Sequence, residues 1–142
     1  MASYNKFHQF VEDLASGVHN FSSHRCKVVL TLASPASSNS VLADLTQATA
    51  SNGYTSGGLT ASIIDSSQSN GLYKLTLEDV SFTASGGDMP LFRYVSLYND
   101  TPTSPADPLI AYWDYGSTVN ITSGNSFTID FPTTASGIFQ LS

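Results

Sequence analysis

The first segment of the chain, residues 3–18, has apolar side chains at the spacing of one face of an α-helix. Polar residues fill the other positions, as expected for a helix that is buried on one side only. The apolar positions are Phe7, Phe10, Val11, Leu14 and Val18. Ser3 can cap the amino end, and Gly17 and Asn20 are residues that commonly end helices. The pattern predicts one amphipathic helix, which either covers an open end of the domain or contacts a neighbouring subunit.

From residue 26 onward, the periodicity changes to that of β-strands. Short apolar runs alternate with clusters of Gly, Asn, Asp, Ser and Pro at intervals of about ten residues, as in antiparallel β proteins. Residues 41–50 have an ambiguous pattern, in which Asp44 to Thr49 fit either a strand or a short helical turn. The strands at 72–77 and 80–84 are either separate or continuous through a bulge at Glu78-Asp79. The predicted strands are residues 26–33, 59–64, 72–77, 80–84, 91–99, 109–115, 118–122, 126–131 and 137–141.

Residues 126–131 show the clearest alternation of a half-buried strand. Their apolar side chains, Phe127, Ile129 and Phe131, share one face, and the polar side chains Thr128 and Asp130 share the other. This strand is therefore predicted to cover a core with one face only.

Two segments have the chemistry of turns. Residues 51–58 contain Asn52-Gly53 and Gly57-Gly58, which adopt positive φ at little cost. We expect a flexible surface loop there unless a ligand binds it. Residues 66–71 are predicted to form the turn that follows the strand at 59–64.

The stretch from Leu91 to Gly116 is apolar on both faces of its strands. In its first strand, Phe92, Tyr94 and Tyr98 are predicted to share one face, and Leu91, Val95 and Leu97 the other. In its second strand, Tyr112 and Trp113 point to opposite faces, so only one of them is expected in the core. Such strands are covered on both sides, either by a second sheet and the helix or by a partner subunit.

These apolar faces lead to a hypothesis about self-association. The helix and the two central strands supply the large side chains that an interface between subunits needs. The hypothetical interface residues are Phe7, Phe10, Leu14, Phe92, Tyr94, Tyr98, Tyr112, Trp113 and Tyr115.

Length and composition complete the expected fold. A chain of 142 residues favours one hydrophobic core. We therefore predict a single domain over residues 1–142, with the helix at 3–18 and a β domain at 26–142. The fold class is mainly β, an antiparallel β-sandwich or barrel-like domain with one N-terminal amphipathic α-helix. Cys26 is the only cysteine, so an intrachain disulfide is excluded, and its apolar surroundings favour a buried structural role.

Charge limits the classes of partner. Charged residues make up only 11% of the chain, compared with roughly a quarter in an average soluble domain. The net charge of -6 argues against direct binding of nucleic acid, which depends on neutralising phosphates. No segment has the roughly 18 apolar residues of a membrane span, and no signal peptide pattern is found. We expect a soluble protein that is synthesised in a cytoplasm.

The residues that could carry catalysis or hold a metal lack the spacing that those sites require. No serine lies in a Gly-x-Ser-x-Gly elbow, and all three histidines lie in the first 24 residues. His8 and Glu12 lie four residues apart but have no third ligand. Asp100, Asp107 and Asp114 lack EF-hand spacing, and the first two precede Thr-Pro and Pro in positions typical of turns. We predict no enzyme activity, no catalytic residue, no cofactor and no metal site.

Four blocks of the sequence resemble a family of small structural proteins of tailed bacteriophages, which are usually encoded among the virion genes. The blocks are YNKFHQFVEDLASGVHNF at residues 4–21, NGYTSGG at 52–58, TASGG at 83–87 and FRYVSLYNDTPTSPADPLIAYWDYGSTVNI at 92–121. The similarity runs from Tyr4 nearly to the carboxyl end, and the segment YNDTPTSPADPLI is the most distinctive part.

The resemblance implies a capsid decoration, or cement, protein on the outer head surface of the virion, made in the cytoplasm of the bacterial host. Proteins of this type are often trimers, so the implied partners are the major capsid protein and the chain itself. The loop at residues 100–108 is then expected to make external contacts, although an ordered connection without a partner would have the same sequence. The alternatives are a tail protein (tube, tip or receptor-contacting module) and, more remotely, a carbohydrate-binding module in which Trp113 or Tyr115 stacks on a sugar.

Overall fold

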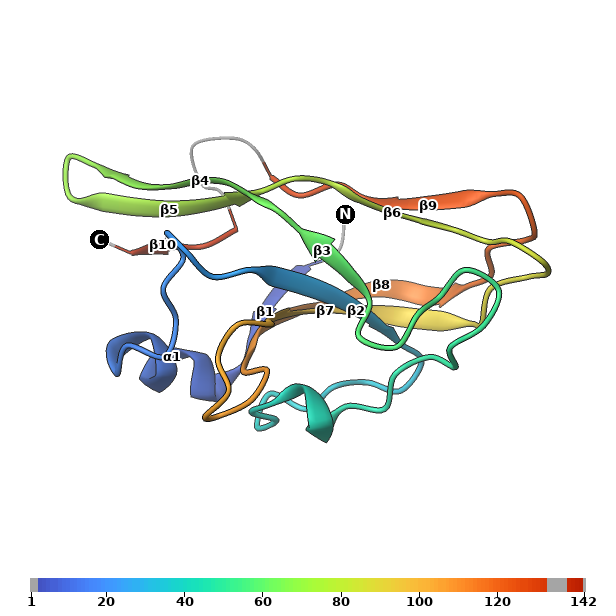
Figure 1. Ribbon diagram of the computed structural model, residues 1–142, viewed down its shortest axis with the longest axis horizontal. Coiled ribbons are helices and arrows are strands. Elements are labelled where there is room, and N and C mark those ends of the chain that lie inside the picture. The colour runs from blue at the N-terminus through green and yellow to red at the C-terminus, as the bar shows by residue number, and fades with distance from the viewer. Residues whose placement is uncertain (1–2, 133–137, 142) are drawn as a thin grey trace.

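Two layers of antiparallel β-sheet form the framework of the described structure (Figure 1). The computed structural model describes residues 3–132 and 138–141. The elements are β1 (Ser3–Lys6), α1 (His8–Ala15), β2 (Cys26–Thr31), the 3-10 helix η1 (Leu42–Asp44), β3 (Leu59–Ala61), β4 (Ile63–Ser69), β5 (Leu72–Leu77), β6 (Val80–Thr83), β7 (Phe92–Asn99), β8 (Leu109–Val119), β9 (Ser126–Ile129) and β10 (Gln140–Leu141). The predicted fold class, mainly β with antiparallel sheets in a sandwich-like arrangement, is confirmed.

One layer is a five-stranded sheet in the order β1-β8-β7-β2-β3. The other layer consists of a three-stranded sheet, β10-β5-β4, and a two-stranded sheet, β6-β9, which lie end to end in Figure 1. The main hydrophobic core lies between these layers. Its largest fully buried side chains include Leu30, Leu75, Leu77, Phe82 and Phe92.

A second apolar cluster lies on the opposite face of the five-stranded sheet. Its buried members are Phe7, Val29, Tyr98 and Leu109, and half-buried side chains that include Leu42 of η1 pack against them. Residues of the chain itself therefore cover both faces of the central strands. The two-sided apolar pattern is explained by burial within the subunit.

The predicted helix at 3–18 is wrong at its amino end. Residues 3–6 form β1, which pairs antiparallel with β8 at the edge of the large sheet, and α1 begins only at His8. Phe7 occupies the N-cap position without a side-chain hydrogen bond, so Ser3 is not the cap. The hydrogen bonds to β8 give residues 3–6 more partners than the first turn of a short helix would, because the first N–H groups of a helix are unpaired.

The terminating role predicted for Gly17 is confirmed, although α1 ends at Ala15 and not at residue 18. Gly17 has φ +82°, and its N–H donates to the Leu14 carbonyl (3.4 Å). The Val18 N–H donates to the Asp13 carbonyl (2.9 Å), which completes a Schellman motif. The predicted apolar face is only partly correct, since Val11 is exposed and Asp13, predicted on the polar side, is buried.

The predicted single strand at 59–64 is divided at Ser62. β3 pairs with β2 in the large sheet, whereas β4 pairs with β5 in the opposite layer. The chain therefore crosses between the layers at one residue, and β4 continues through residues 66–69, which had been predicted as a turn. The turn is Asn70-Gly71, with φ of 54° and 82°, a pair typical of tight hairpins.

The loop at 51–58 has the predicted positive φ angles but is packed onto β2. Tyr54 is buried, its hydroxyl donates to Gln47 Oε1 (2.9 Å), and it accepts a hydrogen bond from the Leu30 N–H (3.3 Å). Gly58 lies so close to Val28 that a Cβ would meet the Val28 carbonyl oxygen at 1.7 Å. The expectation of a flexible loop is therefore wrong, because one aromatic side chain anchors it.

Candidate interaction surface

Four of the nine hypothetical interface residues are inaccessible. Phe7, Phe10, Phe92 and Tyr98 are buried inside the subunit, where the chain's own layers cover them. They cannot contact a partner in this fold, which corrects the hypothesis for these four. Leu14, Tyr94, Tyr112 and Trp113 are half-buried, and Tyr115 is 54% exposed.

An irregularity in the pairing of β7 with β8 projects Tyr115 outward. Phe92 pairs with Val119 and Tyr94 pairs with Asp114, so residues 115–118 of β8 lie opposite the single residue Arg93. Gly116 within this bulge has φ +100°. Bulges of this kind redirect side chains at the edges of sheets.

The bulge also explains why Phe92 faces the main core. The sequence places Phe92 on the face of Tyr94 and Tyr98, but Phe92 packs in the same cluster as Val95 and Leu97. An irregular step between Phe92 and Tyr94 reverses the alternation of β7. The predicted opposition of Tyr112 and Trp113 is confirmed, since they pack against the clusters on opposite faces of the sheet.

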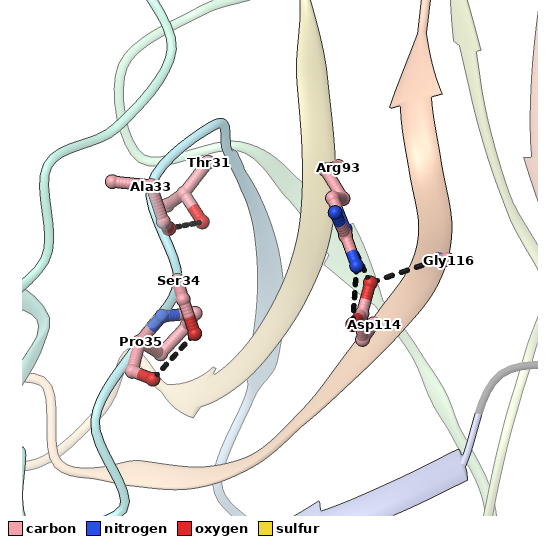
Figure 2. Close-up of polar contacts among 7 residues, drawn as sticks. All are labelled: Thr31, Ala33, Ser34, Pro35, Arg93, Asp114 and Gly116. Carbon is pink, nitrogen blue, oxygen red and sulfur yellow. Dashed lines mark hydrogen bonds and ion pairs between the residues drawn. The ribbon is translucent and has the colours of Figure 1, made fainter.

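Asp114 holds the bulge in place. Arg93 donates from Nε to Asp114 Oδ1 (2.8 Å) and from Nη2 to Oδ2 (3.1 Å), and the Gly116 N–H donates to Oδ1 (2.8 Å), as Figure 2 shows. The hydrogen bonds from Arg93, and then that from Gly116, hold the pKa of Asp114 below its ordinary value. The same pairing raises the pKa of Arg93. This bidentate contact joins two neighbouring strands through a planar, oriented pair.

Aromatic side chains surround this ion pair on both faces of the sheet edge. Tyr4 of β1 lies opposite Trp113 and contacts it edge to face, with ring centroids 5.8 Å apart. Tyr115 contacts Phe127 of β9, with ring centroids 5.4 Å apart. The Arg93 guanidinium lies 5.4 Å from the ring centroid of Tyr94. We call this surface the aromatic edge and define it as Tyr4, Tyr94, Trp113 and Tyr115. The sequence did not indicate Tyr4, because its segment was predicted to be helical.

The loop at residues 100–108 projects beyond the sheet as a braced hairpin. Residues 103–106 at its tip are exposed, and Thr103 and Ala106 form an isolated bridge. At its base, the Leu42 N–H donates to the Asp107 carbonyl (2.9 Å), and Val41 pairs with Pro108. The contacts with residues 41 and 42 therefore fix the base of the loop, and the exposed tip extends from this base.

The acidic residues of this region do not converge. Asp100 contacts Arg25 (2.6 Å), whereas Asp114 contacts Arg93. Asp107 lies in a turn as expected, with φ +50°, and the Asp100 side chain accepts a hydrogen bond from Arg25. Among the described residues, no group of three or more His, Cys, Asp and Glu is arranged to hold a metal ion.

The histidines after α1 belong to a buried polar cluster. Asn99 donates from Nδ2 to His19 Nδ1 (3.1 Å) and His24 Nδ1 (2.9 Å), and its Oδ1 accepts from the Thr101 N–H (3.1 Å). Burial, and secondarily the charge of His24, lowers the pKa of His19 to about 4. The cluster fastens the connection between α1 and β2 to the end of β7.

No helix among the described residues is long and apolar enough to cross a membrane. Comparison of the chain with protein-family models, with curated proteins and with solved structures found no match.

Proposed function

We propose that this protein is a structural component of a tailed-phage virion, of the capsid decoration type, which binds the outer head surface and stabilises the shell. The resemblance described above supports the proposal, and its most distinctive segment, residues 98–110, forms the end of β7, the braced loop and the start of β8. The observation that carries the proposal is the aromatic edge, where exposed tyrosines flank a bidentate arginine–aspartate pair on neighbouring strands.

The composition of the aromatic edge is that of a protein–protein interface. Tyr, Trp and Arg are enriched at the centres of interfaces, where they supply large contact areas with few rotatable bonds. Tyr115 is 54% exposed and Tyr4 is 37% exposed, so both have surface left to bury. Moderate contacts of this size suffice on a closed shell, because many copies are held at once.

The two prominent surfaces have separate roles in this proposal. The aromatic edge joins copies of the chain into a trimer, and the tip of the loop at 103–106 contacts the major capsid protein. The loop suits an external contact because its tip is exposed, while its base is fixed to η1 by the Leu42 and Val41 contacts.

The decisive experiment is quantitative mass spectrometry of purified virions, combined with an electron microscopy reconstruction. We expect a copy number comparable with that of the major capsid protein, and density on the outer head surface. A few copies per particle, or recovery only in tail fractions, would assign the chain to the tail instead.

A variant separates the role of the loop from that of the aromatic edge. Replacing residues 103–106 with Gly and Ser at the same length should lower occupancy on virions without changing the solution mass. Ser69→Gly, at the exposed end of β4, serves as the control and should leave the occupancy and the solution mass unchanged. Full occupancy of the loop variant would contradict the assigned contact.

A further inference from the structure

A groove of about 530 Å³ lies where the two layers of the sandwich part. The pairing of β3 with β2 ends at Ala61 and Cys26, and after Ser62 the chain continues as β4 in the other layer. This divergence opens a space between residues 21–25, just before β2, and residues 60–66. The space lies at the β3 end of the five-stranded sheet, whereas the aromatic edge lies at the β1–β8 end.

The lining of the groove is hydroxyl-rich and carries a positive charge. Phe21 and Ala61 are buried and apolar, and five lining residues are Ser or Thr. The ionisable residues among the described lining residues are His24 and Arg25, and no carboxylate is among them. In a chain of net charge -6, this local charge favours an anionic group.

Arg25 and His24 retain donors for such a group. One nitrogen of Arg25, Nη2, contacts Asp100 Oδ2 at 2.6 Å, and the Arg25 side chain is 63% exposed. A guanidinium has five N–H donors, so most of them are available to a ligand. His24 Nδ1 accepts from the Asn20 N–H (3.1 Å) and from Asn99 Nδ2, which leaves the N–H at Nε2 as a further donor.

One side of the groove is the edge of a sheet. Within the described residues β4 has one neighbour, β5, in the order β10-β5-β4, so its outer backbone groups face away from the sheet. The register shifts between Ile63 and Asp65, and Ile64 at this irregularity is 56% exposed. Sheet edges recognise extended peptides by adding a strand, and neighbouring side chains supply specificity.

We propose that this groove binds an extended peptide segment of another protein that carries a carboxylate side chain. The peptide backbone pairs with the outer edge of β4, an apolar side chain packs against Ile64, and the carboxylate accepts hydrogen bonds from Arg25 and His24. The edge of β4, which no strand of the described residues covers, and the exposed isoleucine favour a peptide over an acidic sugar, which would use the charge and the hydroxyls alone. The inference does not depend on a role in the virion, since it concerns the opposite edge of the sheet.

The test begins with a random heptapeptide display library selected on the immobilised full-length chain, followed by titration calorimetry of the enriched peptides. We expect enrichment of peptides with Asp or Glu between β-branched or aromatic residues. In NMR titrations, their binding should shift amide signals of residues 21–25 and 63–66. Absence of enriched acidic peptides, or shifts confined to the β1–β8 edge, would overturn the proposal.

Two substitutions at the Arg25–Asp100 contact distinguish binding from a structural effect. Arg25→Gln should weaken binding about tenfold or more, because it removes charge-assisted hydrogen bonds to the peptide carboxylate. Asp100→Asn should strengthen binding, since it removes the carboxylate that competes for the same guanidinium. Both substitutions break the same ion pair, so a purely structural role would change affinity in the same direction for both.

The strand edge is tested with a matched pair of exposed aliphatic residues. Ile64→Ser should weaken peptide binding several-fold, whereas Leu32→Ser, at a side chain that is 49% exposed elsewhere, should have no effect. Equal effects of the two variants would refute the Ile64 contact. Preferential binding of acidic oligosaccharides, lost in Arg25→Gln, would overturn the peptide assignment and identify the groove as a sugar site.

Discussion

At the scale of single residues, His19 is a buried base whose environment keeps it neutral. Its Nδ1 accepts a hydrogen bond from Asn99, and burial lowers its pKa from 6.5 to about 4. Protonation would remove the acceptor and place a charge in the core beside Phe10 and Phe21. The histidine therefore stabilises the fold only in its neutral form.

The lowered pKa of His19 predicts how the stability of the fold depends on pH. Because the pKa of His19 is lower in the folded state than in the unfolded chain, the unfolded state binds more protons between about pH 4 and 6.5. The free energy of unfolding should therefore decrease by about 1–2 kcal/mol from pH 7 to pH 5, as measured by urea denaturation. Hydrogen bonds lower the pKa values of Asp44 and Asp114 below the ordinary 3.8, so these two carboxylates stay ionised between pH 7 and 5.

His19→Asn tests the origin of this decrease, because it keeps an acceptor near Asn99 but does not titrate. The variant should show a nearly flat dependence between pH 7 and 5, whatever its absolute stability. His8→Asn, at an exposed position on α1, is the control and should keep the full decrease. An unchanged slope in the His19 variant would show that another group is responsible.

Alanine substitutions at two glycines distinguish the cost of backbone strain from the cost of a steric clash. Gly17 and Gly58 both have positive φ, but an added Cβ meets nothing within 4 Å at Gly17, and meets the Val28 carbonyl oxygen at 1.7 Å at Gly58. Gly17→Ala should cost about 1–2 kcal/mol of unfolding free energy, the cost of the left-handed conformation alone. Gly58→Ala should cost clearly more, because β2 must also move. Equal losses in urea denaturation would contradict the close packing of the 51–58 loop.

At the scale of elements, the β1–α1 segment connects the two hydrophobic clusters. Phe7 is buried in the cluster on the outer face of the large sheet, and Phe10 is buried in the main core three residues later. The change from strand to helix between Lys6 and His8 makes this possible, since it directs the two rings to different clusters.

Phe7→Ala should therefore destabilise the protein as a core substitution does, by about 3–5 kcal/mol in the free energy of unfolding. Val11→Ala, on the exposed side of α1, should change the free energy of unfolding by less than about 0.5 kcal/mol. The small gain in helix propensity offsets part of the loss of the exposed side chain. Thermal or urea unfolding of the two variants measures the difference. An equally large loss of unfolding free energy at Val11 would contradict its exposed position. It would mean that the whole apolar face predicted from the sequence, Val11 included, is buried.

At the scale of the whole molecule, the five-stranded sheet has different chemistry at its two ends. The β1–β8 end carries the aromatic edge with the Arg93–Asp114 pair, and the β3 end adjoins the cationic groove. The two proposed interfaces lie at opposite ends of the sheet, so we expect that both can be occupied at once.

Light scattering tests self-association through the aromatic edge, because it measures the mass of the protein in solution. We expect the wild-type chain to give a mass of three times 15.1 kDa at micromolar concentration. Tyr115→Ser should shift the mass towards the monomer, since it removes the most exposed ring of the aromatic edge. Leu32→Ser is the control for loss of an exposed apolar side chain and should retain the wild-type mass. A monomeric wild-type chain would contradict the trimer.

Much of the fold could be read from local patterns. β9 covers residues 126–129 of the strand predicted at 126–131 and has the predicted alternation, Gly17 ends the helix, and Asn52-Gly53 and Gly57-Gly58 adopt positive φ. These features depend on side-chain period and on the conformational freedom of glycine, which neighbouring residues in the sequence determine. The candidate surface was predicted only in part, since Tyr94, Trp113 and Tyr115 were indicated and Tyr4 was not.

The sequence by itself determined the fold class, the absence of an intrachain disulfide and the apolar character of both faces of the central strands. Only the tertiary structure decided what covers those faces, because a hydrophobic pattern records that a side chain is buried but not by which part of the molecule. It also decided the division at Ser62 and the reversal at Phe92, which depend on hydrogen-bond partners far away in the chain. For the same reason, Arg93 and Asp114, 21 residues apart, became a pair only when β7 met β8.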